Sequence, residues 1–263
     1  MWCAAGVFAG GILVSGQIQT PEPRKQFGAS ITGAFEGWFF NPDGSRSFLV
    51  GYYNRNSQQA IDVPIGPNNR IEPSGPDLGQ PTHFLPGRQW GMFVVPAPRE
   101  FKPTDSYVWT IVANGQSTSI PLRLHPDYVM SPFEEIAVGN TPPVLQFEGA
   151  PASGTGPLGT KTSIKAVAGT PVTVKFQVTD DKKALPQKRV IGVRLTWARY
   201  RGAGAVTIGD FTKSVDGNGE ANVTVTFAEP GEYVLRVEAM DNEIHDFHCC
   251  WSNGYIHATV AAR

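Results

Sequence analysis

The chain has 263 residues, of which 41% are hydrophobic and 11% aromatic, and this content excludes an intrinsically disordered protein. Its formal net charge is -1, and no basic stripe interleaves with aromatic residues, so the sequence does not indicate a nucleic-acid partner. The 29 glycines and 22 prolines occur as scattered turn signals, and only 17% of residues are charged, a composition that favours β structure.

The first residues predict export. Residues 4–14 form an apolar run that is too short to span a bilayer but suits the core of a signal peptide. We therefore interpret residues 1–16 as a signal peptide or truncated leader and residues 17–26 as a tether, although no Lys or Arg precedes the run. The expected location is extracytoplasmic (periplasm, cell surface or secreted), with no transmembrane span.

Residues 27–125 are predicted to form an N-terminal β-sandwich domain. The turn signals Asn41-Pro42-Asp43-Gly44 and Asn114-Gly115 each lie between two apolar runs, as in hairpins. The expected strands cover residues 34–40, 48–53, 60–65, 91–95, 107–113 and 117–124. The segments GWFFNPDGS, GYYNRN, PIGPNN and GQPTHFLPGRQWGMF resemble segments of bacterial exported proteins of unknown function, and this resemblance implies no activity.

Aromatic residues are crowded into this first domain. Consecutive residues of a strand face opposite ways, so some of these side chains must leave the core of their own sheet. They either stack on a sugar ring at an exposed surface or pack against the core or the other domain. The candidates for an aromatic binding surface are Trp38, Tyr52, Tyr53 and Trp90.

Residues 126–160 are predicted to be a linker because they are rich in proline and glycine, with a single helical turn over residues 131–137. Residues 161–263 are predicted to form a second sandwich. Apolar and polar residues alternate over 172–179, and similar runs recur at 193–197, 223–227, 233–239 and 256–260, after a first strand at 162–167. Turn signals at 216–219, 230–231 and 253–254 separate the runs.

Two features of this second half point to a known kind of domain. Trp197 lies on the third strand, and the segment PGEYVLRV at 230–237 leads to Ala239-Met240-Asp241-Asn242. These features resemble immunoglobulin-like domains of the PKD or cadherin-like sort, a resemblance that implies the fold and leaves function open. The predicted fold class is all-β, with two β-sandwich domains joined by the Pro/Gly-rich linker.

One dense cluster of chemically versatile residues lies before the last strand. Its members and their expected neighbours at the same pole of the sandwich are Asp180, Asp181, Asp241, Glu243, His245, Asp246, His248, Cys249, Cys250 and His257. In an oxidising compartment Cys249 and Cys250 could form a disulfide, which across a trans peptide would be strained.

Two kinds of metal site are alternatives to that disulfide, and a fourth interpretation is a polar loop tip above buried thiols. A turn at 253–254 would place Cys250 opposite His257, and with His248 these ligands suit zinc or copper. The carboxylates suit calcium instead. No cofactor is required by any other feature of the sequence.

The function expected from these features is that of a non-catalytic binding or structural protein, with cell-surface proteins or glycans as partners. Two motifs of hydrolases, Gly-x-Ser-x-Gly and His-Glu-x-x-His, are absent from the sequence. The alternatives are a metal-binding protein or metal-dependent enzyme that uses residues 241–257, and a carbohydrate-binding module.

Overall fold

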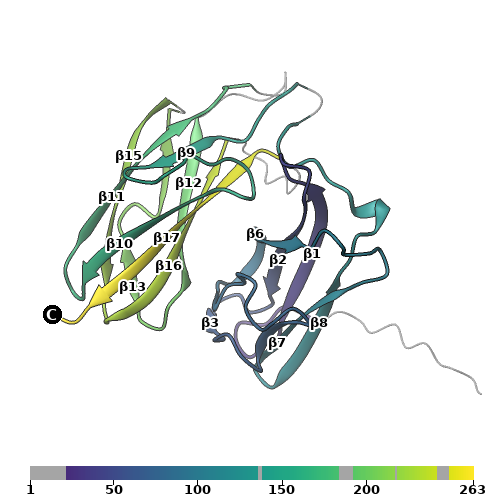
Figure 1. The fold of residues 1–263 in the computed structure, drawn as a ribbon. Coiled ribbons are helices and arrows are strands. Elements are labelled where there is room, and N and C mark those ends of the chain that lie inside the picture. Colours follow the sequence, from purple (N-terminus) through teal and green to yellow (C-terminus); the bar gives the residue numbers. More distant parts are fainter. Residues whose placement is uncertain (1–21, 136–137, 184–191, 217, 242–248) are drawn as a thin grey trace, which may run out of the picture.

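The computed structural model describes residues 22–263 except 136–137, 184–191, 217 and 242–248. Within these residues the fold is all-β, and the one helical element is a short 3-10 turn, η1 (Pro126–Tyr128). Figure 1 shows two β domains side by side, the N-terminal one in purple to teal and the C-terminal one in teal to yellow. The predicted fold class of two β sandwiches is confirmed.

The first domain is built from two small sheets that enclose an aromatic core. One sheet has the order β1-β2-β6, the other has the order β4-β7-β8, and β3 pairs with β5. The strands are β1 (Ile31–Phe40), β2 (Arg46–Asn54), β3 (Ile61–Asp62), β4 (Asn69–Glu72), β5 (His83–Phe84), β6 (Gly87–Ala97), β7 (Tyr107–Ala113) and β8 (Gln116–Leu122). Trp109 lies at the centre, with Phe93 edge-on and Phe84 stacked against it. Burial of such rings supplies most of the stabilisation in a core of this size.

The hairpin predicted at Asn114-Gly115 is confirmed. Ala113 pairs with Gln116, which leaves Asn114 and Gly115 as a two-residue turn with φ of 50° and 73°. Positive φ at both positions is the geometry that matches the twist of the strands, and asparagine and glycine adopt it at low energetic cost.

The segment predicted to be a linker contains a strand. β9 (Val144–Phe147) pairs antiparallel with β11 (Val172–Thr179), and Leu145 and Phe147 are buried in the second domain. Part of residues 126–160 is therefore an edge strand of the second sandwich, hidden in the sequence by the prolines and glycines around it. The described residues of the predicted helical turn, 131–135, are not helical, and η1 lies just before them.

The second domain is a sandwich of two larger sheets. One has the order β10-β17-β16-β12-β14 and the other β13-β15-β11-β9, and β10 runs parallel to β17. The remaining strands are β10 (Thr160–Val167), β12 (Val193–Arg201), β13 (Val206–Ile208), β14 (Thr212–Val215), β15 (Asn218–Phe227), β16 (Gly231–Met240) and β17 (Trp251–Ala261). Trp197 packs edge-on against Phe176 between the sheets. The alternating apolar residues read from the sequence form this core.

The turn predicted at Asn253-Gly254 is wrong, because β17 runs through both residues without interruption. The Asn253 side chain is fully buried and bonded to other parts of the fold. At Gly254 a β-carbon would lie 2.7 Å from Val237 and 2.8 Å from Phe147. Packing requirements rather than a turn explain this Asn-Gly pair.

Candidate functional site

The two domains meet along the outer face of the sheet that contains β16 and β17, which faces β6 of the first domain (Figure 1). Trp251, Asn253 and Tyr255 alternate along β17 and point to the same face because side chains of a strand repeat every two residues. The Asn253 amide donates to the Gly91 carbonyl at 2.9 Å, and the Tyr255 hydroxyl donates to the Met92 carbonyl at 2.8 Å. The last strand therefore joins the domains through its side chains.

An apolar cluster closes one end of this interface. Trp251 and Met240 from the second domain pack with Phe39 and Leu49 from the first, together with Met130. Gly91 lies against the Trp251 ring, where a β-carbon would be only 2.4 Å from two ring carbons. Only glycine allows the backbone of β6 to approach the indole this closely.

Ion pairs close the other end. Arg199 lies 3.0 Å from Asp62, and Arg201 lies 2.8 Å from Asp77 on the next loop of the first domain. The Arg201 guanidinium holds the pKa of the Asp77 carboxyl below its usual range. The Tyr200 hydroxyl also donates to the carbonyl of Gly79. These paired contacts at both ends hold the two domains in one arrangement.

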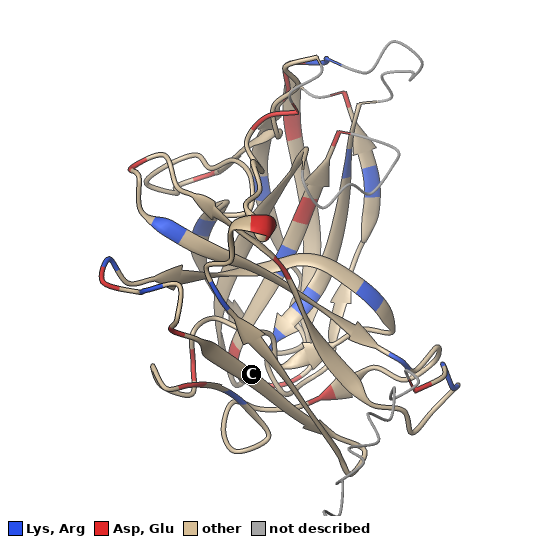
Figure 2. Cartoon of the chain, turned by 90° about the vertical axis from the view of Figure 1, so that its right-hand side faces the viewer, with Lys and Arg blue, Asp and Glu red and all other residues tan. Residues whose placement is uncertain are grey.

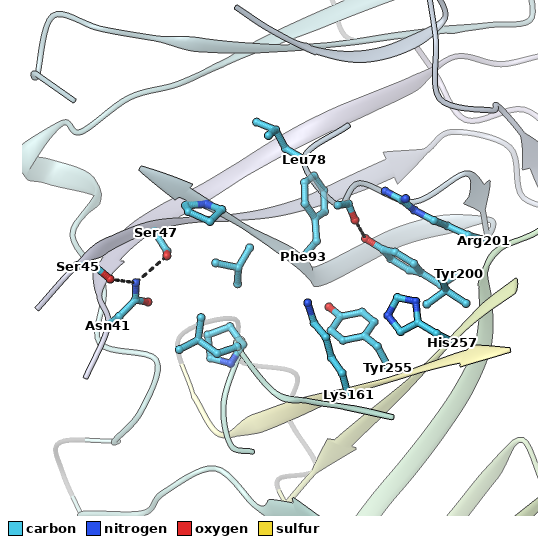
Figure 3. Close-up of a pocket in the computed structure, with 16 residues that line it drawn as sticks. Asn41, Ser45, Ser47, Leu78, Phe93, Lys161, Tyr200, Arg201, Tyr255 and His257 are labelled. Atoms are coloured by element: carbon cyan, nitrogen blue, oxygen red, sulfur yellow. Dashed lines mark hydrogen bonds between the residues drawn. The ribbon is translucent and has the colours of Figure 1, made fainter. Parts of the chain in front are cut away.

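A partly open cavity of about 500 Å³ lies between the domains, beside these contacts. Figure 3 shows its two sides, with Phe93 and Leu78 from the first domain across from Lys161 and Tyr255 from the second. The volume falls within the range of about 300–1,000 Å³ that is typical of small-molecule sites. The lining residues are Asn41, Ser45, Ser47, Leu78, Gly79, Phe93, Val94, Pro96, Pro157, Leu158, Lys161, Tyr200, Arg201, Val234, Tyr255 and His257.

The second domain supplies the basic groups of the cavity. Lys161 of β10 pairs in register with Tyr255 of β17, so the two side chains stand on one face, and His257 follows two residues later. Burial, and then the charge of Lys161, lower the pKa of His257, so its imidazole is neutral at pH 7. Arg201 is neutralised by Asp77, whereas Lys161 meets no carboxylate within ion-pair distance among the described residues. Lys161 is therefore the cation available to a ligand.

The first domain supplies hydrogen-bonding groups at the opposite end. The Asn41 amide nitrogen donates to the hydroxyls of Ser45 at 2.7 Å and Ser47 at 2.9 Å. Its Oδ1 is buried and has no hydrogen-bond partner in the described part of the chain. The cavity thus combines a cation and hydroxyl groups with apolar and aromatic walls.

The predicted cysteine and carboxylate cluster is brought together in part. Cys249 and Cys250 are joined by a disulfide across a cis peptide bond, and both are buried. Asp180, Asp181 and Asp241 converge at the same end of the sandwich, since both Asp180 and Asp181 act on the pKa of Asp241. Four of the predicted members lie outside the described residues: Glu243, His245, Asp246 and His248.

The predicted pairing of Cys250 with His257 in a zinc or copper site is wrong. With no turn at 253–254, the two residues are seven positions apart on one extended stretch, a separation of about 23 Å. His257 lines the cavity, whereas Cys250 lies at the other end of β17. Within the part of the chain that the structure describes, no group of three or more His, Cys, Asp or Glu side chains is arranged to hold a metal ion.

The predicted aromatic surface is wrong at two of its four positions. Trp38 and Tyr52 are buried, and both belong to the core of the first domain. Tyr53 and Trp90 are half-buried, each beneath an arginine side chain, with the Arg88 guanidinium 3.7 Å from the Trp90 ring centre. These four side chains do not form an open platform, because the core and the arginines cover the rings.

Sequence reasoning missed the cavity between the domains. One signal for it was present: the outward-facing positions of the last strand carry Trp251 and Tyr255 as well as polar residues. A strand with large apolar residues on both faces is covered on both faces: Ile256 and Val260 pack in the second sandwich, and the first domain covers Trp251 and Tyr255.

Comparisons with known proteins found no matching family model and no matching curated protein. Among solved structures, domains 4 and 5 of the S-layer protein SbsC are 12% identical, with a TM-score of 0.27 over 60% of this chain and 66% of that one. The D00-D0 domain of intimin is 14% identical, with a TM-score of 0.27 over 88% of this chain and all of that one.

The fibronectin(III)-like modules of Clostridium thermocellum CbhA are 11% identical, with a TM-score of 0.26 over 89% of this chain and 95% of theirs. The chain spans less than a third of two longer SbsC structures, 28% and 30%. Among the described residues, no helix has the length and apolar character needed to cross a membrane.

Proposed function

We propose that the chain is a non-catalytic extracytoplasmic binding protein that holds an acidic sugar in the cavity between its two domains. The observation that carries the proposal is the position of Lys161, which lines a cavity of about 500 Å³ without a carboxylate partner among the described residues. An ammonium group at a partly apolar cavity favours an anionic group of a ligand, because charge-assisted hydrogen bonds are stronger than neutral ones.

The remaining wall favours a hydroxylated ligand. The Ser45 hydroxyl accepts from the Asn41 amide and donates to Asp43, so it keeps one lone pair that can accept from a ligand hydroxyl. The rings of Phe93 and Tyr255 provide apolar surface of the kind on which the C–H face of a sugar packs. A ligand that has a carboxylate, several hydroxyls and an apolar ring face is a uronic acid or a short oligosaccharide that contains one.

One observation of the structure supports the extracytoplasmic part of the proposal. The Cys249–Cys250 disulfide belongs to an oxidising compartment, since cytosolic thiols are kept reduced. In the part of the chain that Figure 2 colours, Lys and Arg positions are interspersed with Asp and Glu positions. The apolar run at residues 4–14 fits the same location but lies outside the described residues.

The test is a calorimetric titration with oligogalacturonate as the acidic probe and the matching neutral galactose oligosaccharide as its counterpart. Lys161→Met removes the charge and keeps the length of the side chain. Lys165→Met is the matched control, because Lys165 is exposed on the same face of β10 but does not line the cavity. We expect Lys161→Met to weaken binding of the acidic probe about tenfold to hundredfold, the value of one hydrogen bond to a charged group.

The control should bind as the unmodified protein does, and added salt should weaken binding of the acidic probe. Equal affinity for the neutral oligosaccharide would remove the role assigned to Lys161. No binding of either probe at millimolar concentration would remove the cavity as a sugar site.

A further inference from the structure

The end of the second sandwich opposite the cavity gathers polar side chains from three parts of the chain. Asp241 follows β16, Asp180 and Asp181 follow β11, and Asn140 comes from the segment before β9. The Asn140 amide nitrogen donates to Asp241 Oδ2 at 2.9 Å. The next residue, Thr141, donates through its backbone nitrogen and hydroxyl to Asp181 Oδ2 at 3.1 and 3.0 Å.

Three oxygen atoms of this group are buried without a hydrogen-bond partner among the described residues. They are Oδ1 of Asn140, Oδ1 of Asp180 and Oδ1 of Asp241. Asn140 is 1% exposed, so solvent does not reach its amide from outside. Buried polar atoms are almost always paired in native proteins, and three unpaired acceptors at one end of the sandwich indicate a missing electropositive partner.

The lysines of this region pair with other carboxylates than Asp180 and Asp241. Lys183 lies 3.7 Å from Asp181 and donates to the Gly139 carbonyl. It therefore pairs with Asp181 rather than with Asp180 or Asp241. Lys182 pairs with Asp216. Among the described residues, neither the Asp180 nor the Asp241 carboxylate therefore forms an ion pair.

We propose that Asp180, Asp241 and Asn140 bind a calcium ion at this end of the second domain. Carboxylate and amide oxygens are the ligands that Ca²⁺ prefers, and its coordination of 6–8 oxygens leaves positions for water and backbone carbonyls. Zinc and copper fit less well because the Cys249 and Cys250 sulfur atoms are bonded to each other and offer no thiolate.

The neighbouring disulfide fixes one side of this site. The Cys250 Sγ atom lies 3.3 Å from the backbone carbonyl of Asn140, and the Asp241 nitrogen donates to the Cys250 carbonyl at 3.5 Å. The residues on either side of the proposed ion are thereby held to the start of β17. A rigid surround of this kind raises the affinity of a cation site because less ordering accompanies binding.

The experiment is a calorimetric titration of the full chain with CaCl2 after dialysis against EDTA, in the absence of any sugar. We expect one Ca²⁺ per chain. Asp180→Asn and Asp241→Asn should each weaken binding about a hundredfold or more, since even the outer partners of metal ligands change affinity about 10–100-fold. Asp127→Asn is the control, because Asp127 is exposed in η1, which packs beside β1 of the first domain.

A melting curve separates binding from a merely structural role. CaCl2 should raise the melting temperature of the unmodified chain but not that of Asp241→Asn, which in EDTA should melt no lower because it has lost the repelling carboxylate. Binding that survives in both variants, or the absence of any Ca²⁺ binding, would overturn the proposal. Lys161→Met should bind Ca²⁺ normally, so this result does not depend on the sugar site. If Asp241→Asn does not fold, the Asp180→Asn titration decides alone.

Discussion

Replacing Gly91 with alanine tests whether the domains pack through Trp251 as the structure shows. Gly91 has a φ of +53°, a region in which a residue with a β-carbon loses about 1–2 kcal/mol. The new β-carbon would also lie 2.4 Å from two carbons of the buried Trp251 ring, and overpacking of this kind costs about 1–3 kcal/mol. The expected loss is therefore about 2–5 kcal/mol.

Gly44→Ala is the matched control, because Gly44 has a φ of +81° and no atom within 4 Å of the added β-carbon. It should lose only the backbone contribution, about 1–2 kcal/mol. The assay is urea unfolding followed by tryptophan fluorescence and far-ultraviolet circular dichroism, which should coincide in one transition. Equal losses for the two alanine variants would refute the packing of Gly91 on Trp251. A double variant with Trp251→Leu should show a coupling of about 1–3 kcal/mol, and strict additivity would refute it as well.

Three further outcomes are expected. Tyr255→Phe should lower the free energy of unfolding in urea by about 1–3 kcal/mol, because the buried Met92 carbonyl loses its donor, and an effect below 0.5 kcal/mol would contradict that hydrogen bond. In EDTA, the raised pKa of Asp241 contributes its full stabilisation at pH values below 3.8, the pKa of this carboxyl in the unfolded chain. The contribution is lost as the pH rises through the folded-state pKa of about 7. The difference in unfolding free energy between the unmodified chain and Asp241→Asn should therefore change between pH 5 and pH 8, and a constant difference would contradict the shift. The intact mass of the exported chain should be lower by two hydrogen atoms than that of the reduced chain, and equal masses would contradict the Cys249–Cys250 disulfide.

The sequence was sufficient to predict most strands because each of them shows a local pattern of residue types. Val174, Phe176 and Val178 alternate with polar residues, and this period of two follows directly from the pleat of a strand. The hairpin at Asn114-Gly115 is equally local, since the turn geometry itself requires these residue types. By the same local rule Asn253-Gly254 looked like a turn, and the rule failed there because the Asn253 side chain is used for contacts across the interface.

The candidate sites depend on contacts between residues far apart in the chain. Lys161 in the sequence is indistinguishable from any solvated lysine, and it becomes a candidate ligand group only because Phe93 and Leu78 lie across from it. The convergence of Asp180 and Asp181 with Asp241 was predictable from the topology of an immunoglobulin-like sandwich. The participation of Asn140 was not, because it comes from a segment whose composition indicated only a linker.

The way β17 joins the two domains bears on how such a chain can change during evolution. Domains connected only by a linker can be exchanged by recombination, since each keeps its own surface intact. Here the second domain transplanted alone would expose Trp251 and Tyr255 to water. The first domain alone would expose the backbone at Gly91 that Trp251 now covers. The two sandwiches are therefore expected to be inherited together as one module. Insertion of a single residue between Trp251 and Tyr255 would put these two interface side chains on opposite faces of β17.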